Sequence, residues 1–241
     1  MRSAFVLGLL KLGLTANGQE AGLTWQGGTL GGATGGGGGP TWLLAEDFEG
    51  SNGGFDLAGW SAVNVLPNPD YTVHVLSGTQ SCALTNLAQC GAGHTYSAPS
   101  STNYFYIQLF LLNYPSSGHE GQFVEVDGSG YNLALKVTET GRIRLQDTGS
   151  DKAITNNGMA TNTLYNVWFA YCQGSGANGF AFACFDSSST RPTAGNQYCS
   201  YASMSGATAP ATFYLYNGAQ TYTQVVIDRV RIDDVPIDTA P

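Results

Sequence analysis

Two carboxylates on one short segment are the first residues in this chain that could carry out catalysis. Glu125 and Asp127 are separated by a single valine, and residues two apart on a β-strand point to the same face. A retaining glycosidase uses two carboxyl groups about 5–5.5 Å apart, one as nucleophile and one as acid. The three histidines, His74, His94 and His119, lie in no recognisable triad or metal motif, and no Gly-x-Ser-x-Gly sequence is present.

A second group of residues has side chains suited to binding sugars. Tyrosine stacks its ring on the C–H face of a sugar and hydrogen-bonds through its hydroxyl. Tyrosines alternate with other apolar residues in two predicted strands, and a loop between two further strands carries an arginine and an asparagine that could rim a site. Ordinary core packing is the alternative role for any one of these aromatic residues. The predicted carbohydrate-binding residues are Tyr104, Tyr106, Tyr214, Tyr216, Arg191 and Asn196.

The elements that would position these side chains are strands. Only 11% of residues are charged, whereas Gly, Ser, Thr, Asn and Tyr are abundant, a composition typical of short strands joined by turns. No convincing amphipathic helix is found. Turn signals about every ten residues predict a β-sandwich or barrel. The predicted strands are 42–48, 71–76, 104–112, 122–126, 131–137, 142–146, 164–173, 179–185, 211–216 and 224–232.

The strand over 104–112 is apolar or aromatic on both faces. This pattern predicts either a central strand that is buried on both sides or one with a face exposed for binding. The segments 164–173 and 179–185 flank the sequence GSGANG and are predicted to form a hairpin.

Charge and cysteine content limit the possible partners and compartments. The net charge of −8 makes nucleic-acid binding unfavourable, because a phosphate backbone repels such a surface. The five cysteines have no Cys-x-x-Cys spacing, and their number is odd. Cys82 could pair with Cys90, and Cys184 with Cys199; alternatively, all five are small buried apolar residues.

The first 40 residues differ from the rest. Residues 1–26 are predicted to be an anchoring arm, 27–40 a glycine-rich linker, and 41–241 the globular domain. Residues 1–18 also resemble a secretory signal, with Arg2 before an apolar stretch from Phe5 to Leu14, but Lys11 interrupts that stretch. The apolar stretch is too short to span a bilayer.

Motifs at the two ends of the domain resemble those of concanavalin-like and carbohydrate-binding jelly rolls. The domain opens with LLAEDFEG at 43–50, followed by Gly59-Trp60, and closes with VVIDRVRIDDVPI at 225–237. The stretch 165–196, with its GSGAN turn and its TRPTAGN loop, resembles small jelly-roll proteins of bacteriophages and environmental bacteria. The resemblance implies an all-β jelly-roll sandwich whose first and last strands lie side by side.

The resemblance also implies a possible metal site and a possible activity. Many carbohydrate-binding jelly rolls hold a structural calcium ion between their end strands, and calcium takes oxygen ligands. The matching acids here are Asp47, Glu49, Asp228, Asp233 and Asp234. Glycosidases among concanavalin-like sandwiches carry a Glu-x-Asp-x-Glu strand, of which this chain keeps only Glu125 and Asp127, so the sequence predicts a protein that is not an enzyme.

The function predicted from the sequence is therefore that of a bacteriophage virion protein. The arm would bind other virion subunits, and a lectin-like jelly roll of a head fibre, decoration protein or tail appendage would touch cell-surface glycans. Homo-oligomerisation on the particle would raise the avidity of weak sites. The alternative is a secreted bacterial carbohydrate-binding or adhesion protein with a cleaved signal at residues 1–18.

Overall fold

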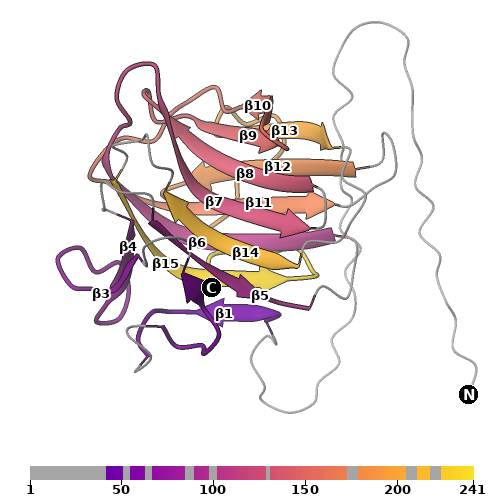
Figure 1. Cartoon of the computed structure of the whole chain (residues 1–241). Helices are drawn as coiled ribbons and strands as arrows, with labels where there is room; N and C mark the ends of the chain where they lie inside the picture. Colours follow the sequence, from indigo (N-terminus) through magenta and orange to yellow (C-terminus); the bar gives the residue numbers. More distant parts are fainter. Residues whose placement is uncertain are drawn as a thin grey trace, which may run out of the picture. The chain divides into compact units, whose positions relative to one another are not determined.

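All regular structure in the described residues is β-strand. The structure is a computed structural model that describes residues 42–50, 55–62, 67–84, 90–97, 102–128, 131–172, 179–204, 211–217 and 224–241. The predicted arm and linker over residues 1–40 lie outside the described residues. The strands form two antiparallel sheets that pack face to face, and Figure 1 shows β7 and β14 of one sheet in front of β6 and β11 of the other. The fold is a jelly-roll β-sandwich, as predicted.

The eight-stranded sheet contains the first and last strands of the domain. Its order is β13-β12-β11-β6-β15-β4-β3, and β1 pairs with β15 beside this path. The strands are β1 (Leu44–Glu46), β3 (Asn68–Tyr71), β4 (Ser81–Leu84), β6 (Thr102–Asn113), β11 (Leu164–Cys172), β12 (Gly179–Asp186), β13 (Cys199–Met204) and β15 (Gln224–Asp233).

The seven-stranded sheet has the order β10-β9-β8-β7-β14-β5-β2. Its strands are β2 (Ser61–Ala62), β5 (Cys90–Thr95), β7 (Glu120–Gly128), β8 (Tyr131–Thr138), β9 (Ile143–Asp147), β10 (Ser150–Ile154) and β14 (Thr212–Asn217). Strands β7, β8, β9 and β14 alternate apolar inward-facing residues with polar or aromatic outward-facing ones, which is the pattern of a sheet with one solvated face.

Aromatic rings from both sheets meet in the core. Phe105 of β6 stacks on Phe169 of β11, with ring centroids 4.7 Å apart and planes at 3°. Phe213 of β14, in the other sheet, lies 6.1 Å from Phe105. All three are at most 1% exposed. Burial of such rings is the main favourable contribution to packing one sheet on the other.

The two ends of the domain are joined as the resemblance implies, because β1 pairs antiparallel with β15. A buried carboxylate strengthens this junction. Glu46 at the end of β1 accepts hydrogen bonds from the backbone N–H groups of Phe48, Asp56 and Leu57 and from Nε1 of Trp60. Burial raises the pKa of Glu46, and these four donors partly offset that rise. The carboxylate thereby holds the 55–60 loop against the start of the domain.

Most predicted strands are present with small changes in their ends, and β6 is the predicted central strand. The hairpin of β11 and β12 is confirmed. The prediction of a strand over 71–76 is wrong: β3 ends at Tyr71, the following residues form bends, and Val73 is 71% exposed. Val73 and Val75 match the alternating pattern, but no neighbouring strand pairs with them in the described residues. Strands β2, β3, β4, β5, β10 and β13 were not predicted.

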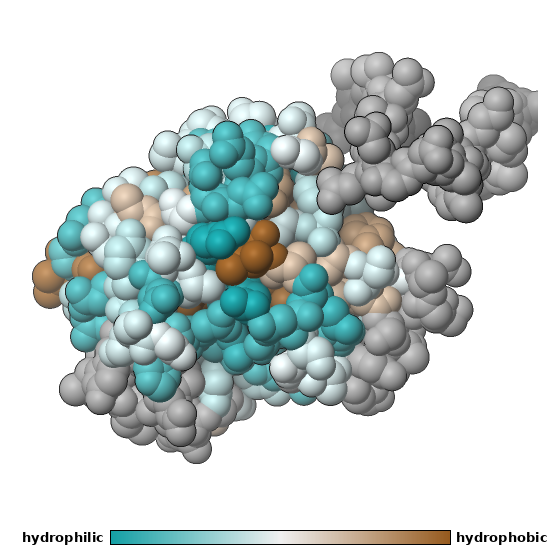
Figure 2. All heavy atoms as spheres, turned by 90° about the horizontal axis from the view of Figure 1, so that it is seen from above, coloured by the Kyte–Doolittle hydropathy of each residue, from teal (hydrophilic) through white to brown (hydrophobic). Residues whose placement is uncertain are grey.

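The side of the molecule on which β10 and β13 lie carries mainly hydrophilic residues. Figure 2 views this side and shows a largely hydrophilic surface with a small hydrophobic area near its centre. Strand β10 contributes the exposed residues Ser150, Asp151 and Lys152. Charged side chains on an edge strand oppose pairing with another chain's strand.

Candidate functional site

The outward-facing tyrosines of β14 are the most prominent feature of the solvated face of the seven-stranded sheet. Side chains alternate along a strand, so Phe213 and Leu215 enter the core while Tyr214 and Tyr216 point outward. Both tyrosines are partly exposed. The structure thus brings together two of the predicted sugar-binding residues on one face.

A glycine in the neighbouring strand determines where one of these rings lies. Tyr214 pairs with Gly93 of β5, and Tyr216 pairs with Gly91. A Cβ atom added to Gly93 would lie only 2.3 Å from a ring carbon of Tyr214. The Tyr214 ring therefore lies against the backbone of β5, in space that a side chain at position 93 would fill. This contact holds the ring in place on the surface of the sheet.

A row of polar side chains continues from Tyr214 across the same face. The registers pair Tyr214 with Glu125, Glu125 with Ala134, Ala134 with Gln146, and Gln146 with Asp151. Residues paired across antiparallel strands share a face, so all five project outward. Nε2 of Gln146 donates to Oδ1 of Asp151 at 2.6 Å. The small side chain of Ala134 separates the carboxylate of Glu125 from the amide of Gln146.

The next row adds a lysine to the same face, on β8, which is separated from β14 by β7. Lys136 of β8 pairs with Gln122 of β7 and with Arg144 of β9. Gln122 donates from Nε2 to Oε2 of Glu125 at 2.6 Å, which links the two rows. The structure shows no ion pair for Lys136 with the described residues. Its ammonium group is therefore a positive charge that a ligand could use.

The guanidinium of Arg144, in contrast, is neutralised by the protein. Its Nε lies 2.5 Å from Oε1 of Glu120, and its Nη1 forms an ion pair with Asp151. Two carboxylates on one guanidinium leave this end of the face without excess positive charge. Lys136 is thus the cation on this face that is best placed to attract an anionic group.

The phenol of Tyr216 is a proton donor at neutral pH. Burial raises its pKa, and the negative charge of Glu125 adds to the rise, because both effects disfavour the phenolate. Tyr216 therefore keeps its proton near neutral pH. It can donate a hydrogen bond to a sugar oxygen or a proton to a leaving oxygen, whereas it is a poor base.

Glu125 and Asp127 share the outward face of β7, as predicted, because Val126 between them enters the core. Asp127 pairs with Thr212 of β14. Sequence reasoning found Glu125 but missed four residues around it: Gln122, Lys136, Arg144 and Gln146. The alternation in β8 and β9 marks Lys136, Arg144 and Gln146 as outward-facing. Gln122 reaches the same face as Glu125 only through the register shift between Gln122 and Val124, which the sequence pattern does not reveal.

The other predicted sugar-binding residues lie elsewhere. Tyr104 and Arg191 are on the outer side of the eight-stranded sheet, the opposite side of the sandwich from Tyr214. Tyr106 is fully buried there and donates from its hydroxyl to Oδ1 of Asn166 at 2.6 Å. Asn196 caps its own loop by accepting a hydrogen bond from the N–H of Tyr198 at 3.0 Å. Sugar contact by these residues stays a prediction.

The acids predicted to hold calcium are engaged by protein groups at separate points. Asp228 is fully buried and accepts hydrogen bonds from N–H of Ser77 and Oγ of Ser81. Asp47 forms an ion pair with Arg231 at 2.6 Å. Burial raises the pKa of Asp228 to about 6.

Glu49 and Asp233 of the predicted calcium set are bonded in the same way. Glu49 accepts hydrogen bonds from Thr79 and from N–H of Gln80, and Oδ1 of Asp233 accepts from N–H of Asp234. Among the described residues, no cluster of three or more His, Cys, Asp or Glu side chains is arranged to hold a metal ion. Calcium binding stays a prediction, which melting curves with calcium and with a chelator would test.

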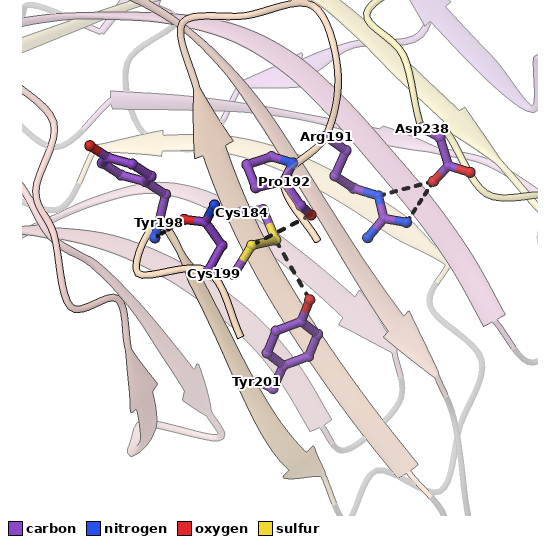
Figure 3. Close-up of a disulfide and its surroundings, with 8 residues drawn as sticks. Cys184, Arg191, Pro192, Tyr198, Cys199, Tyr201 and Asp238 are labelled. Carbon is purple, nitrogen blue, oxygen red and sulfur yellow. Dashed lines mark hydrogen bonds and ion pairs between the residues drawn. A yellow bond between two sulfur atoms is a disulfide. The ribbon is translucent and has the colours of Figure 1, made fainter. Parts of the chain in front are cut away.

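One of the two cysteine pairings considered from the sequence is confirmed. Cys184 of β12 and Cys199 of β13 are paired in register and form a disulfide with their Cα atoms 4.1 Å apart. Figure 3 shows this disulfide beside Tyr201 and Pro192 on the outer side of the eight-stranded sheet. Cys82 and Cys90 are buried thiols. In the part of the chain that the structure describes, no helix is long and apolar enough to cross a membrane.

Comparison with known proteins yields matches in structure but none in sequence. No protein-family model matches the chain, and no curated protein matches its sequence. The cellulose-induced protein Cip1 superposes with a TM-score of 0.56 at 13% identity, over 82% of this chain and 100% of that one. The endo-β-1,4-glucuronan lyase of the fungus Trichoderma reesei gives 0.55 at 12% identity, covering 83% and 98%. A PL-14 alginate lyase from Aplysia kurodai gives 0.54 at 12%, covering 80% and 99%.

These similarities overturn one prediction and establish one conclusion. The prediction that the chain is not an enzyme is contradicted, because two polysaccharide lyases have this fold over nearly their whole length. The missing glutamate of the Glu-x-Asp-x-Glu pattern argues against one glycosidase mechanism only, and this fold also supports lyases. At these identities the similarity shows the fold alone, which is the jelly-roll β-sandwich.

Proposed function

We propose that the outer face of the seven-stranded sheet binds a polysaccharide chain. The observation that carries this proposal is that Tyr214 and Tyr216 share one face of the sheet with Gln122, Glu125 and Lys136. The rings offer flat surfaces for sugar C–H groups, while the amide, carboxylate and ammonium groups match sugar hydroxyls and acidic substituents. The fold shared with Cip1 and the two lyases supports this assignment.

Binding can be measured by titrating the protein with alginate, β-1,4-glucuronan and hydroxyethyl cellulose. Loss of one stacked ring costs about 0.5–1.5 kcal/mol, so Tyr214→Ala should weaken binding about 2- to 10-fold. Tyr114 lies outside this face and is 38% exposed, so Tyr114→Ala is the matched control and should bind as the unaltered protein does. Absence of binding to all three polymers, or equal binding by Tyr214→Ala, would exclude this face as the site.

Cleavage of the bound chain by β-elimination is a second candidate function, and Lys136 is the residue that favours it. In this reaction a base removes the proton at C5 of a uronate, the C4–O4 bond breaks, a C4=C5 double bond forms, and O4 takes up a proton. An adjacent cation must offset the carboxylate charge to make C5–H acidic enough. In this proposal Lys136 would bind that carboxylate, Glu125 would accept the C5 proton, and Tyr216 would protonate O4.

The test of cleavage uses the ultraviolet absorbance of the unsaturated product. Incubation with alginate or glucuronan should produce it, whereas hydroxyethyl cellulose, which lacks uronates, should not. Tyr216→Phe should lower the rate at least 10²-fold, because general acid–base catalysis contributes about 10²–10⁴-fold. Lys136→Ala should also lower it at least 10²-fold, because loss of one group that stabilises developing charge costs about 10²–10³-fold. Polymer binding without any absorbance change would refute β-elimination and leave the binding function standing.

The biological setting is a separate part of the proposal. A bacteriophage virion protein would present this face to cell-surface glycans, whereas a secreted bacterial protein would present it to extracellular polysaccharide. Sedimentation of particles from the native source, with mass spectrometry of the N-terminus, distinguishes them. A particle-bound chain that keeps residues 1–18 supports the virion setting, and a soluble chain that begins near Gln19 supports secretion.

A further inference from the structure

The outer side of the eight-stranded sheet carries a second aromatic row, independent of the site proposed above. The registers align Tyr201 of β13 with Phe182 of β12, Phe182 with Ala170 of β11, Ala170 with Tyr104 of β6, and Tyr104 with Asp233 of β15. The rings of Phe182 and Tyr201 lie 5.7 Å apart, and Tyr201 is 42% exposed. The row thus runs from an exposed aromatic ring to a carboxylate.

A cavity lies at the carboxylate end of this row. Its volume is about 290 Å³, and its lining combines one indole ring, two carboxylates and apolar groups of the C-terminal segment. The indole of Trp42 packs against the same apolar cluster as Tyr104, so cavity and aromatic row adjoin. The lining residues are Trp42, Asp233, Val235, Pro236, Ile237, Asp238, Thr239 and Pro241.

The walls of this cavity are held in place before any ligand arrives. The guanidinium of Arg191 forms a 2.6 Å ion pair with Asp238 and lies 5.1 Å from the ring centroid of Phe182. The backbone N–H of Arg191 donates to the carbonyl of Asp238, and that of Ala240 donates to the carbonyl of Ser189. Figure 3 shows Arg191 extending toward Asp238 beside the Cys184–Cys199 disulfide, which joins the strands on either side of the 187–198 loop. A prearranged site loses little entropy on binding.

We propose that this cavity binds one neutral sugar unit, such as the non-reducing end of a glycan. Trp42 would stack on the C–H face of the ring, and Asp233 and Asp238 would accept hydrogen bonds from hydroxyls, while Arg191 would hold the Asp238 carboxylate in place. The volume lies at the lower end of the range of ligand pockets, about 300–1,000 Å³, and suits one sugar rather than an extended chain. Asp233 and Asp238 are the charged side chains that line the cavity itself, and their carboxylates disfavour uronates and sulfated sugars.

The chain would then have two carbohydrate sites of different kinds on opposite sides of the sandwich. The face with Lys136 would hold an extended chain, and the Trp42 cavity a neutral terminus. Two sites on one domain could link two glycans or raise the avidity for a branched one.

The experiment follows tryptophan fluorescence and amide NMR shifts during titration with the methyl glycosides of glucose, galactose, mannose, xylose and fucose, with methyl glucuronide as the anionic control. At least one neutral glycoside should bind, and the glucuronide should bind at least tenfold more weakly. Trp42→Ala and Asp233→Asn should each weaken binding at least tenfold, while Tyr214→Ala on the opposite sheet should bind normally. Circular dichroism melting identifies any variant that fails to fold, and Arg191→Lys serves as a second, milder variant.

Three results would overturn the second site: no glycoside binds, Trp42→Ala and Asp233→Asn bind normally, or Tyr214→Ala abolishes binding. Each can be distinguished from failure of the polysaccharide site, because that site is tested with polymers and by substitutions on the other sheet.

Discussion

The buried carboxylate of Asp228 shows how a single residue can make the stability of this domain depend on pH. Asp228 lies in β15 with no exposed surface, yet it has donors on both oxygens: Oδ2 accepts from Ser77 and Ser81, and Oδ1 accepts from the N–H of Arg229. Burial outweighs these hydrogen bonds and raises the pKa to about 6. A carboxyl group with such a pKa couples the stability of the domain to pH.

The direction of that coupling is determined by the raised pKa. Between pH 3.8, the ordinary pKa of an aspartate, and about pH 6, the folded state binds a proton at Asp228 that the unfolded state has released. The contribution of Asp228 to the free energy of unfolding is therefore complete below about pH 4 and is lost as the pH rises through 6. Other carboxyl groups titrate in the same range, so the contribution is obtained by difference.

Denaturant titrations of the unaltered protein and of Asp228→Asn across this range measure the difference. The variant loses the titration, so the stability of the unaltered protein relative to it should fall as the pH rises from 4 to 6. A constant difference across the range would show that Asp228 does not titrate with a raised pKa.

Gly93 offers a test of the Tyr214 ring position at the same scale. A methyl group at position 93 would lie 2.3 Å from the ring, so Gly93→Ala must displace Tyr214 from the sheet surface. We expect polysaccharide binding to weaken as much as in Tyr214→Ala, about 2- to 10-fold. Isothermal titration checks this, and unchanged binding would mean that the ring need not lie on β5.

At the scale of elements, the disulfide and the loop it closes determine how the eight-stranded sheet ends. Strands β12 and β13 form one end of that sheet, and Cys184 and Cys199 join them directly across the ladder. The two cysteines are 15 residues apart in the sequence, and the loop between them contains Arg191. The disulfide restricts the unfolded chain as well as this loop.

Replacing both cysteines by alanine should therefore destabilise the domain. For a loop of about 15 residues the expected loss is about 3 kcal/mol in the free energy of unfolding. Urea titrations of the unaltered protein with and without a reductant, alongside the double variant, measure this loss. The reductant should not affect the double variant, and an equal effect on both proteins would show that another cysteine is responsible.

At the scale of the whole molecule, stability rests on the core between the two sheets. Phe105 lies at its centre, in contact with Phe169 of its own sheet and near Phe213 of the other. A large ring at such a position cannot be removed without leaving a cavity, because the surrounding strands are hydrogen-bonded and cannot collapse fully.

Phe105→Ala should accordingly cost about 3–5 kcal/mol of unfolding free energy. Phe180 is 39% exposed on the outer side of β12, so Phe180→Ala is the matched control and should cost less than half as much. Chemical denaturation monitored by circular dichroism gives both values. Similar costs for the two variants would contradict a core centred on Phe105.

The sequence by itself determined the class of fold and, for the longer strands, which residues point to the same side of the sheet. Alternation in β6, β7, β8 and β14 is a local property, since neighbouring side chains on a strand point to opposite sides whatever the strand pairs with. The acidic motifs at the two ends indicated the pairing of β1 with β15 by resemblance. Strands β4 and β5 escaped prediction because segments such as CGAGHT have small or polar residues and become strands only through their neighbours.

Only the tertiary structure decided which of these side chains meet. Tyr104 and Tyr214 have the same local pattern, but they lie on opposite sides of the sandwich because β6 and β14 belong to different sheets. Gln122, Lys136 and Arg144 become neighbours through the registers of β7, β8 and β9, which depend on non-local hydrogen bonds and on which face is buried. The pairing of Cys184 with Cys199 was settled in the same way. Sequence periodicity shows to which side of its strand a side chain points, whereas its neighbours on adjacent strands depend on how the whole chain packs.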